Sequence, residues 1–510
     1  MSDDEDGTGV YKVSESPPCF PVYPVYLWHY LVGIIYTPPA LACPFATFSR
    51  RADMQESPAP IPAPRIGMTH SHRANHSVAC DARTNVYVYE DPALNHGWMT
   101  ACESFAALRS SPSSEQLAEV GMLQALTSHP RRVHDPTQAR LVYLGIFEYA
   151  SWALGDLSSC SAAPAHLQNH SNRMREAAAA LRRSPVYARC SGCDHIWATS
   201  ATNAPSLRLV WRIKPLDEML RRAIPGVYRG PPHGHLPSRR AADCAVQIPY
   251  EISARARRAR EDAPRPLLLQ FAGSLDVCCS GQSTRCAIGA LIGMSVTQSD
   301  ISIAPTVRER GAVGPCLARA LTRVRAVRAA VNSSRHDDTD SPRDFVPGSV
   351  LVANALHSAN EAQRSSDAAM AMRRARFCLV PPGDTFVTSR LSQAVAAGCV
   401  PVLFGERARL QASTVGAYPW PQRAHYDAYA ILVHADAFRA DPASVVHLLR
   451  RMDANATEMT RRRDAMARLA MHVLYRARDS AVASNFVDAI PTACFRDIDA
   501  AHECPRKGGG

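Results

Sequence analysis

The sequence predicts an α/β fold in which helices cover parallel β-sheets. From Val86 onward, short apolar runs alternate with alanine-rich stretches of helical character, as expected of repeated strand–helix units. The chain has 510 residues, of which 46% are hydrophobic, enough to build the cores of two or three domains. The clearest apolar runs are 86–89, 141–147, 207–212, 245–250, 267–272, 349–353, 377–380 and 400–404.

The best-defined strand–helix–strand unit begins with the apolar strand 376–380 and a Pro-Gly turn at 381–383. An amphipathic helix follows, then a turn at Gly398 and a second buried strand with Pro401 near its start. Backbone N–H groups at the start of this helix, together with its dipole, favour an anion such as a phosphate. Arg390 lies in the first turns of the helix, so its guanidinium group can pair with the same anion in a forked contact.

This unit resembles the signature of the exostosin-type glycosyltransferases, glycosyltransferase family 47. The family pattern runs from a Phe-Cys-Leu strand through Gly-Asp-Thr and Ser-x-Arg-Leu to Gly-Cys-Ile/Val-Pro-Val, and a match this long at fixed spacing is specific. The matching residues are Phe377, Cys378, Leu379, Gly383, Asp384, Thr385, Ser389, Arg390, Leu391, Gly398, Cys399, Val400, Pro401 and Val402. The chain departs from the pattern at Gln393, where the family usually has Asp or Glu, and at Tyr187, where it has Trp.

Further matches follow the family's order, so that the resemblance extends over about residues 84 to 475. They include an Asp-His block after a glycine turn and the strands that close one half of the chain and open the next. The matching segments are Val86–Tyr89, His134–Tyr143, Tyr187–Trp197, Val246–Tyr250 and Arg265–Gly273. Residues 277–350 match only loosely.

The resemblance implies the GT-B architecture, in which two Rossmann-like domains face a cleft. We accordingly expect an N-terminal, acceptor-side domain at 84–262 and a C-terminal, nucleotide-sugar-binding domain at 263–445, followed by C-terminal helices and a tail at 446–510. The boundary is placed where Glu261–Pro266 has the composition of a linker. In open α/β sheets, ligands bind at the carboxyl ends of the strands.

Residues 1–83 are expected to form an N-terminal tail and stem. Within them, 23–41 are apolar and aromatic and occupy the place of the family's signal anchor, which puts the catalytic part in the lumen of the Golgi apparatus. Pro38-Pro39 interrupts this segment, and acidic residues precede it while Arg50-Arg51 follows it, opposite to the charge order of a lumenal C-terminus. A membrane anchor, a buried apolar arm and a mis-assigned start all remain open.

The resemblance also assigns the donor site. Arg390 is expected to bind the diphosphate and Gln393 the ribose or sugar, while Gly383 permits close approach of the backbone. The alternative for Arg390 is a salt bridge on a helix surface, and for Asp384 it is helix capping. The expected donor-binding residues are Gly273, Gly383, Asp384, Thr385, Ser389, Arg390 and Gln393.

Asp194 and His195 are the expected catalytic residues on the acceptor side. Histidine has an ordinary pKa near neutrality, which suits a general base, and either residue is a candidate to accept the proton. The alternative for His195 is a purely structural role.

No cofactor is expected, because the UDP-sugar donor is a substrate. No metal site is expected, because Asp338-Thr339-Asp340 lies in a polar run rather than after an apolar strand.

The net charge of +11 comes from arginine runs. They are either solvated helix faces or a surface that binds nucleotide-sugar phosphates or an acidic polysaccharide. Nucleic acid is not expected as a partner, because interleaved aromatic residues are missing.

Sixteen cysteines and four glycosylation sequons suit an oxidising, secretory compartment. A redox or metal role for Cys190 and Cys193 is not favoured, and Cys378 and Cys399 are expected to be small buried hydrophobic residues.

The resemblance to the exostosin-type enzymes implies an inverting glycosyltransferase that transfers a sugar from a nucleotide sugar to a polysaccharide or glycoprotein glycan. One alternative, suggested by Gln393, is a catalytically weak carbohydrate-binding or partner subunit of a glycosyltransferase complex. Another is an anionic-glycan binder without a donor site. The sequence leaves homo- and hetero-oligomers open and places the chain at the Golgi membrane with a lumenal catalytic domain.

Overall fold

The computed structural model places residues Cys80–Gly510 in one compact unit. Within it, the structure describes residues 84–111, 116–199, 213–227, 238–252, 264–277, 281–306, 314–334, 361–383, 387–405, 418–475 and 479–501. The expected anchor and stem, the apolar runs 207–212 and 349–353, and Asp338-Thr339-Asp340 lie outside these ranges. None of the described helices combines the length and apolarity needed to cross a membrane.

A six-stranded parallel sheet forms the core of the N-terminal half, with strand order β2-β1-β3-β4-β5-β6. The chain passes from β1 to β2 on one side and then returns to lay β3 on the other side of β1, so the winding reverses there. The strands are β1 (Val86–Val88), β2 (Arg132–Val133), β3 (Leu141–Leu144), β4 (His195–Thr199), β5 (Ile224–Val227) and β6 (Val246–Gln247).

A second parallel sheet of five strands, in the order β11-β10-β9-β7-β8, forms the core of the C-terminal half. Its winding reverses in the same way, between β7 and β9. The strands are β7 (Leu267–Ser274), β8 (Ile301–Thr306), β9 (Ala375–Val380), β10 (Val400–Phe404) and β11 (Ile431–Val433). Two parallel sheets covered by helices confirm the predicted α/β fold with two Rossmann-like domains.

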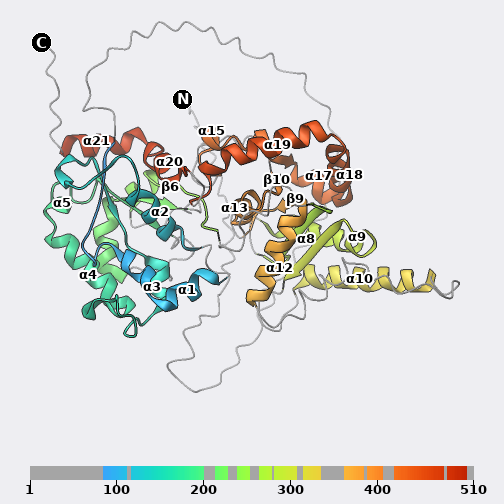
Figure 1. Ribbon diagram of the computed structural model, residues 1–510, viewed down its shortest axis with the longest axis horizontal. Coiled ribbons are helices and arrows are strands. Elements are labelled where there is room, and N and C mark those ends of the chain that lie inside the picture. The colour runs from blue at the N-terminus through green and yellow to red at the C-terminus, as the bar shows by residue number, and fades with distance from the viewer. Residues whose placement is uncertain are drawn as a thin grey trace, which may run out of the picture. The chain divides into compact units, whose positions relative to one another are not determined.

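Helices connect the strands of both sheets (Figure 1). The N-terminal half contains the 3₁₀ helix η2 (His96–Ala101) and helices α1 (Glu103–Ser110), α2 (Ala118–Thr127), α3 (Glu148–Leu154), α4 (His170–Arg183), α5 (Pro185–Ala188) and α7 (Arg239–Asp243). The C-terminal half contains α8 (Gln282–Ile288), α9 (Ile292–Thr297), α10 (Pro315–Ser334), α12 (Glu361–Arg374), α13 (Arg390–Ala396), α15 (Pro421–Ala424), α16 (Tyr426–Tyr429), α17 (Ala435–Ala440), α18 (Pro442–Asp453) and α19 (Ala456–Leu469).

The predicted unit around Arg390 forms as β9, α13 and β10. Gly398 takes a positive φ of 69° in the turn before β10, a conformation that glycine adopts without steric cost. Cys378 and Cys399 are buried as predicted, but the expectation that they act only as hydrophobic residues was wrong, because they form a disulfide. The parallel pairing places Cys378 opposite Pro401, two residues from Cys399, and brings the two Cα atoms within 5.8 Å.

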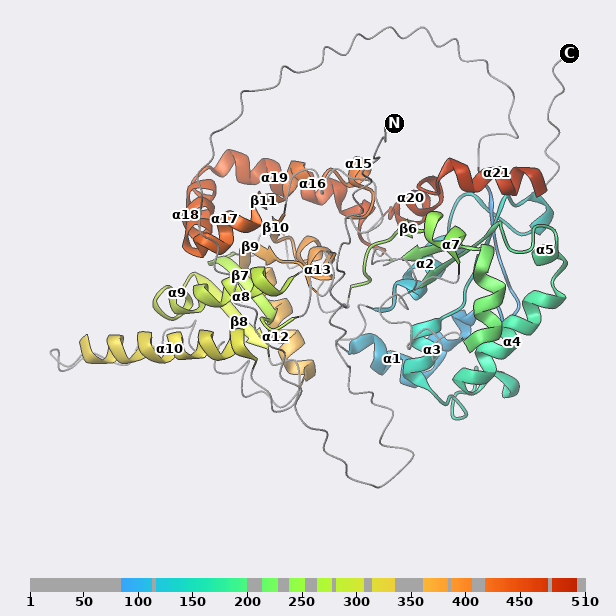
Figure 2. The ribbon, with the colours of Figure 1, turned by 180° about the vertical axis from the view of Figure 1, so that it is seen from behind.

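The chain returns to the N-terminal half at its end, through helices α20 (Val482–Asp488) and α21 (Thr492–Ala501). Figures 1 and 2 show both helices beside the elements of the six-stranded sheet. Phe486 and Ile498 are buried in the same core as Val86. A disulfide joins Cys494 to Cys244, across 250 residues of sequence.

The start of α3 is held by a carboxylate from another helix. Glu119 of α2 is fully buried and accepts hydrogen bonds from the backbone N–H groups of Glu148 (3.0 Å), Tyr149 (3.3 Å) and Ala150 (2.7 Å). Burial raises the pKa of the Glu119 carboxyl well above its usual value, while these three bonds oppose that rise. Glu119 therefore supplies acceptors to N–H groups that have no partner inside the helix.

Replacing Glu119 with Ala should lower the free energy of unfolding by about 3 kcal/mol, because buried N–H groups lose their acceptor. Glu119→Gln keeps one acceptor oxygen and should lose less. Urea denaturation followed by circular dichroism measures the difference. Glu103→Ala, at an exposed position in the first turn of α1, is the matched control and should change little. Equal stabilities of Glu119→Ala and the control would contradict this role.

Candidate active site

The carboxyl ends of β7 and β9 form the point of reversed winding in the C-terminal sheet. The two strands are neighbours, but the chain leaves them toward opposite sides of the sheet. Such a point leaves a crevice between the diverging loops, and ligands of open α/β sheets bind there. Gly273 and Ser274 end β7, and Pro381–Gly383 follow β9, so both predicted glycines lie at this edge.

Arg285 of α8 joins the two loops. Its Nε donates to the carbonyl oxygen of Pro382 at 2.7 Å, and its Nη1 donates to the carbonyl oxygen of Ser274 at 3.0 Å. The side chain is buried. The neighbouring turn is also closely packed, because a Cβ at Gly281 would collide with the Pro382 carbonyl oxygen. Arg285 thus places a positive charge between the ends of β7 and β9.

Arg390 reaches the same position from α13. A Cβ added to Gly273 would lie 3.4 Å from Nη1 of Arg285 and 3.6 Å from Nη2 of Arg390. Two guanidinium groups therefore converge on the backbone of Gly273. The atom nearest to that Cβ would be Cζ of Phe271, at 3.3 Å, so a side chain at this position would press against the ring and glycine is the residue that fits beside both guanidinium groups.

Gln393 fixes the position of Arg390. Nη1 of Arg390 donates to Oε1 of Gln393 at 2.7 Å, one turn along α13. The amide oxygen expected to reach a ribose or sugar is thus engaged with the arginine. Helix α13 has only seven residues, so its dipole is short and the two arginine side chains carry most of the positive potential.

The structure therefore brings together part of the predicted donor site. Gly273, Arg390 and Gln393 meet, Ser389 is buried at the N-cap of α13, and Gly383 lies after β9. Asp384 and Thr385 lie outside the described residues. Arg285 is not among the residues predicted from the sequence, because residues 277–350 resemble the family only loosely. The available signal was its place one turn into a helix that follows a strand.

Asp194 and His195 lie elsewhere, at the amino end of β4. Both side chains are completely buried. His195 bonds through Nδ1 to Oδ1 of Asp194 (2.6 Å) and through Nε2 to the hydroxyl of Tyr89 (3.0 Å). Nε of Arg189 donates to Oδ2 of Asp194 at 2.7 Å.

This network favours the structural alternative for His195. A general base must come within hydrogen-bonding distance of the hydroxyl that it deprotonates. Both ring nitrogens of His195 are hydrogen-bonded to other side chains of the protein, and the side chain is completely buried, so no acceptor hydroxyl can reach it. Arg189 continues the network to the carbonyl oxygens of Pro136 and Ala139, so it holds α5, β4 and the turn before β3 together.

Asp194→Ala should lower the free energy of unfolding by about 3–5 kcal/mol, because it leaves Arg189 and His195 without their shared carboxylate. Denaturant melts measure this loss, with Asp243→Ala, which removes an exposed carboxylate, as control. Asp194→Asn keeps the shape, and its sugar-donor turnover should follow the folded fraction. A fully folded Asp194→Asn protein without turnover would restore the catalytic assignment.

Of the comparisons with known proteins, the one with family models agrees with the resemblance. No curated protein matches the chain. Among solved structures, a chain of the "Crystal structure of GtfA/B complex" is similar at 9% sequence identity and a TM-score of 0.30, over 64% of this chain and 61% of that chain. This chain thus spans less than two thirds of that protein. Residues 80–451 match the family model of the exostosin GT47 domain, which is more than half of the chain. The chain therefore belongs to the exostosin GT47 family of glycosyltransferases.

Proposed function

We propose that this chain is an inverting glycosyltransferase that transfers a sugar from a UDP-sugar to a hydroxyl of a polysaccharide or glycoprotein glycan. One observation carries the proposal. Arg285 and Arg390 converge on Gly273 at the point of reversed winding of the C-terminal sheet. Two cations beside a bare stretch of backbone suit the pyrophosphate of a nucleotide sugar.

The chemistry needs such a site. In a single displacement, the acceptor oxygen forms a bond to the anomeric carbon while the bond from that carbon to the diphosphate breaks. The electron pair stays on the diphosphate, and the hydroxyl proton passes to a base. Fixed positive charges at the leaving oxygen stabilise the charge that develops there. Arg285 and Arg390 are already held by hydrogen bonds, so little reorganisation is needed during the reaction.

The cysteines support a location in the secretory pathway, and we place the enzyme in the Golgi lumen. Five disulfides join described cysteines, among them Cys102–Cys160, Cys244–Cys494 and Cys378–Cys399. Disulfides persist in oxidising compartments and are rare in the cytosol.

A second candidate function is that of a weakly active partner subunit. Gln393 favours it, because an uncharged amide holds Arg390 where the family usually has a carboxylate. The two functions differ in turnover. An active enzyme releases UDP from a UDP-sugar, whereas a partner subunit binds the nucleotide sugar without releasing UDP.

Arg390→Ala should reduce UDP release by about 10²–10³-fold, because it removes one of the two charges at the leaving group. Its melting temperature should stay close to that of the unchanged protein. A luminescent UDP assay over a panel of UDP-sugars measures the effect. Arg439→Ala, which removes a partly exposed arginine of α17, is the control and should retain full activity. Unchanged UDP release by folded Arg390→Ala would refute the site.

A further inference from the structure

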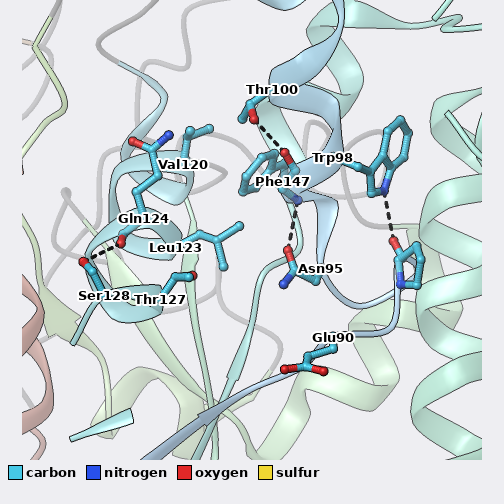
Figure 3. A pocket seen from close by; sticks show the side chains of 12 residues that line it. Glu90, Asn95, Trp98, Thr100, Val120, Leu123, Gln124, Thr127, Ser128 and Phe147 are labelled. Carbon is cyan, nitrogen blue, oxygen red and sulfur yellow. Dashed lines mark hydrogen bonds between the residues drawn. The ribbon is translucent and has the colours of Figure 1, made fainter. Parts of the chain in front are cut away.

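A second point of reversed winding lies in the N-terminal sheet, between β1 and β3. A cavity of about 510 Å³ opens beside it, lined by the loop after β1, the 3₁₀ helix η2, helix α2 and the loop after β3 (Figure 3). This volume lies within the range of about 300–1,000 Å³ typical of small-molecule sites. The cavity therefore occupies the place in this sheet that the arginine pair occupies in the other.

Hydrogen bonds join the walls of the cavity. The backbone N–H of His96 donates to the carbonyl oxygen of Gly145 at 2.8 Å, and the N–H of Phe147 donates to Nδ1 of His96 at 3.1 Å. Burial lowers the pKa of His96 to about 3, so its ring is neutral and Nδ1 can accept. A Cβ at Gly97 would lie 2.9 Å from Oδ1 of Asn95, so glycine permits this packing. The site is formed before any ligand binds.

The lining combines two aromatic side chains, Trp98 and Phe147, with uncharged polar groups. The indole N–H of Trp98 donates to the carbonyl oxygen of Pro92 at 3.2 Å, which fixes the ring's orientation while leaving the side chain partly exposed. Figure 3 shows Leu123 pointing from α2 toward Asn95, with Glu90 and Thr100 at opposite ends of the cavity. The uncharged polar side chains of the lining belong to Asn95, Thr100, Gln124, Thr127 and Ser128.

Glu90 is the one charged residue among the twelve that line the cavity. Nη2 of Arg132, outside the lining, donates to Oε1 of Glu90 at 3.3 Å, and Nδ1 of His134, also outside the lining, lies 3.6 Å from the same oxygen. A phosphate or sulfate needs cationic partners, which this lining does not offer. A pyranose ring presents C–H groups on its faces and hydroxyls around its rim. An aromatic face surrounded by amides, hydroxyls and a carboxylate matches that pattern.

We propose that this cavity binds a neutral sugar unit of the acceptor glycan. Trp98 packs against the face of the ring, and Glu90 with Gln124 accepts or donates hydrogen bonds at its hydroxyls. The assignment of this sugar as the acceptor rests on the proposed glycosyltransferase function, whereas sugar binding at the cavity does not. These residues are binding residues, and none is assigned the role of base.

Isothermal titration calorimetry with cellotetraose, xylotetraose, galactotetraose and a heparin-derived tetrasaccharide tests the proposal, using the full chain without donor. At least one neutral tetrasaccharide should bind, and Trp98→Ala should weaken it by at least about tenfold. Trp152→Ala is the matched control, because Trp152 packs at the edge of the same core but does not line the cavity. Thr127→Trp, which fills the cavity from an exposed position on α2, should abolish binding even if Trp98→Ala folds poorly.

Release of UDP separates this proposal from the proposed function. Trp98→Ala should lose transfer to the tetrasaccharide that binds, whereas Trp152→Ala should hydrolyse UDP-sugar and transfer its sugar at the normal rate. If the unchanged protein releases no UDP while neutral sugar binding depends on Trp98, the cavity assignment stands and the enzyme assignment fails. If no neutral tetrasaccharide binds, if only the heparin fragment binds, or if binding survives Thr127→Trp, the cavity assignment is overturned.

Discussion

A parallel sheet that places its second strand on one side of the first and its third strand on the other must send the loops of two neighbouring strands in opposite directions. Right-handed crossovers leave no other route. Both sheets of this protein are built this way, with orders β2-β1-β3 and β8-β7-β9 at the corresponding places. Arg285 and Arg390 lie at this point in one sheet, and the cavity lined in part by Trp98 and Glu90 lies at it in the other. Chain topology thus locates both sites, and the local side chains determine which ligand each one suits.

Some arginines of this protein bond mainly to carbonyl oxygens of the main chain. Arg173 is fully buried and donates to carbonyl oxygens of Leu167, Gln168, Ser151 and Gly155. Arg265 donates to the carbonyl oxygens of Ala375 and Ala397, at the start of β9 and the end of α13. The arginine-rich composition predicted solvated faces or anion binding. Arg173 and Arg265 add a third use, in which several carbonyl dipoles satisfy one delocalised cation.

The sequence allowed the unit β9–α13–β10 to be predicted because apolar strands, turn residues and helical spacing agree there. Strands β4, β5, β8 and β11 were not among the predicted runs, since they are short or contain polar residues such as His195 and Ser302. The burial of Asp194 and His195 could not be predicted, because a short polar motif does not reveal its tertiary partners. The cavity near Trp98 could not be predicted either, because its lining residues come from several segments between Glu90 and Phe147 that meet only in the folded protein.

The return of α20 and α21 bears on how the protein is made. The ribosome delivers Val86 long before Phe486, yet both belong to one core. The first sheet therefore leaves the exit tunnel with a hydrophobic face that must wait for some 250 further residues before the Cys244–Cys494 bond can close. During that interval the exposed apolar face is prone to aggregate, and Cys244 is open to pairing with the wrong cysteine.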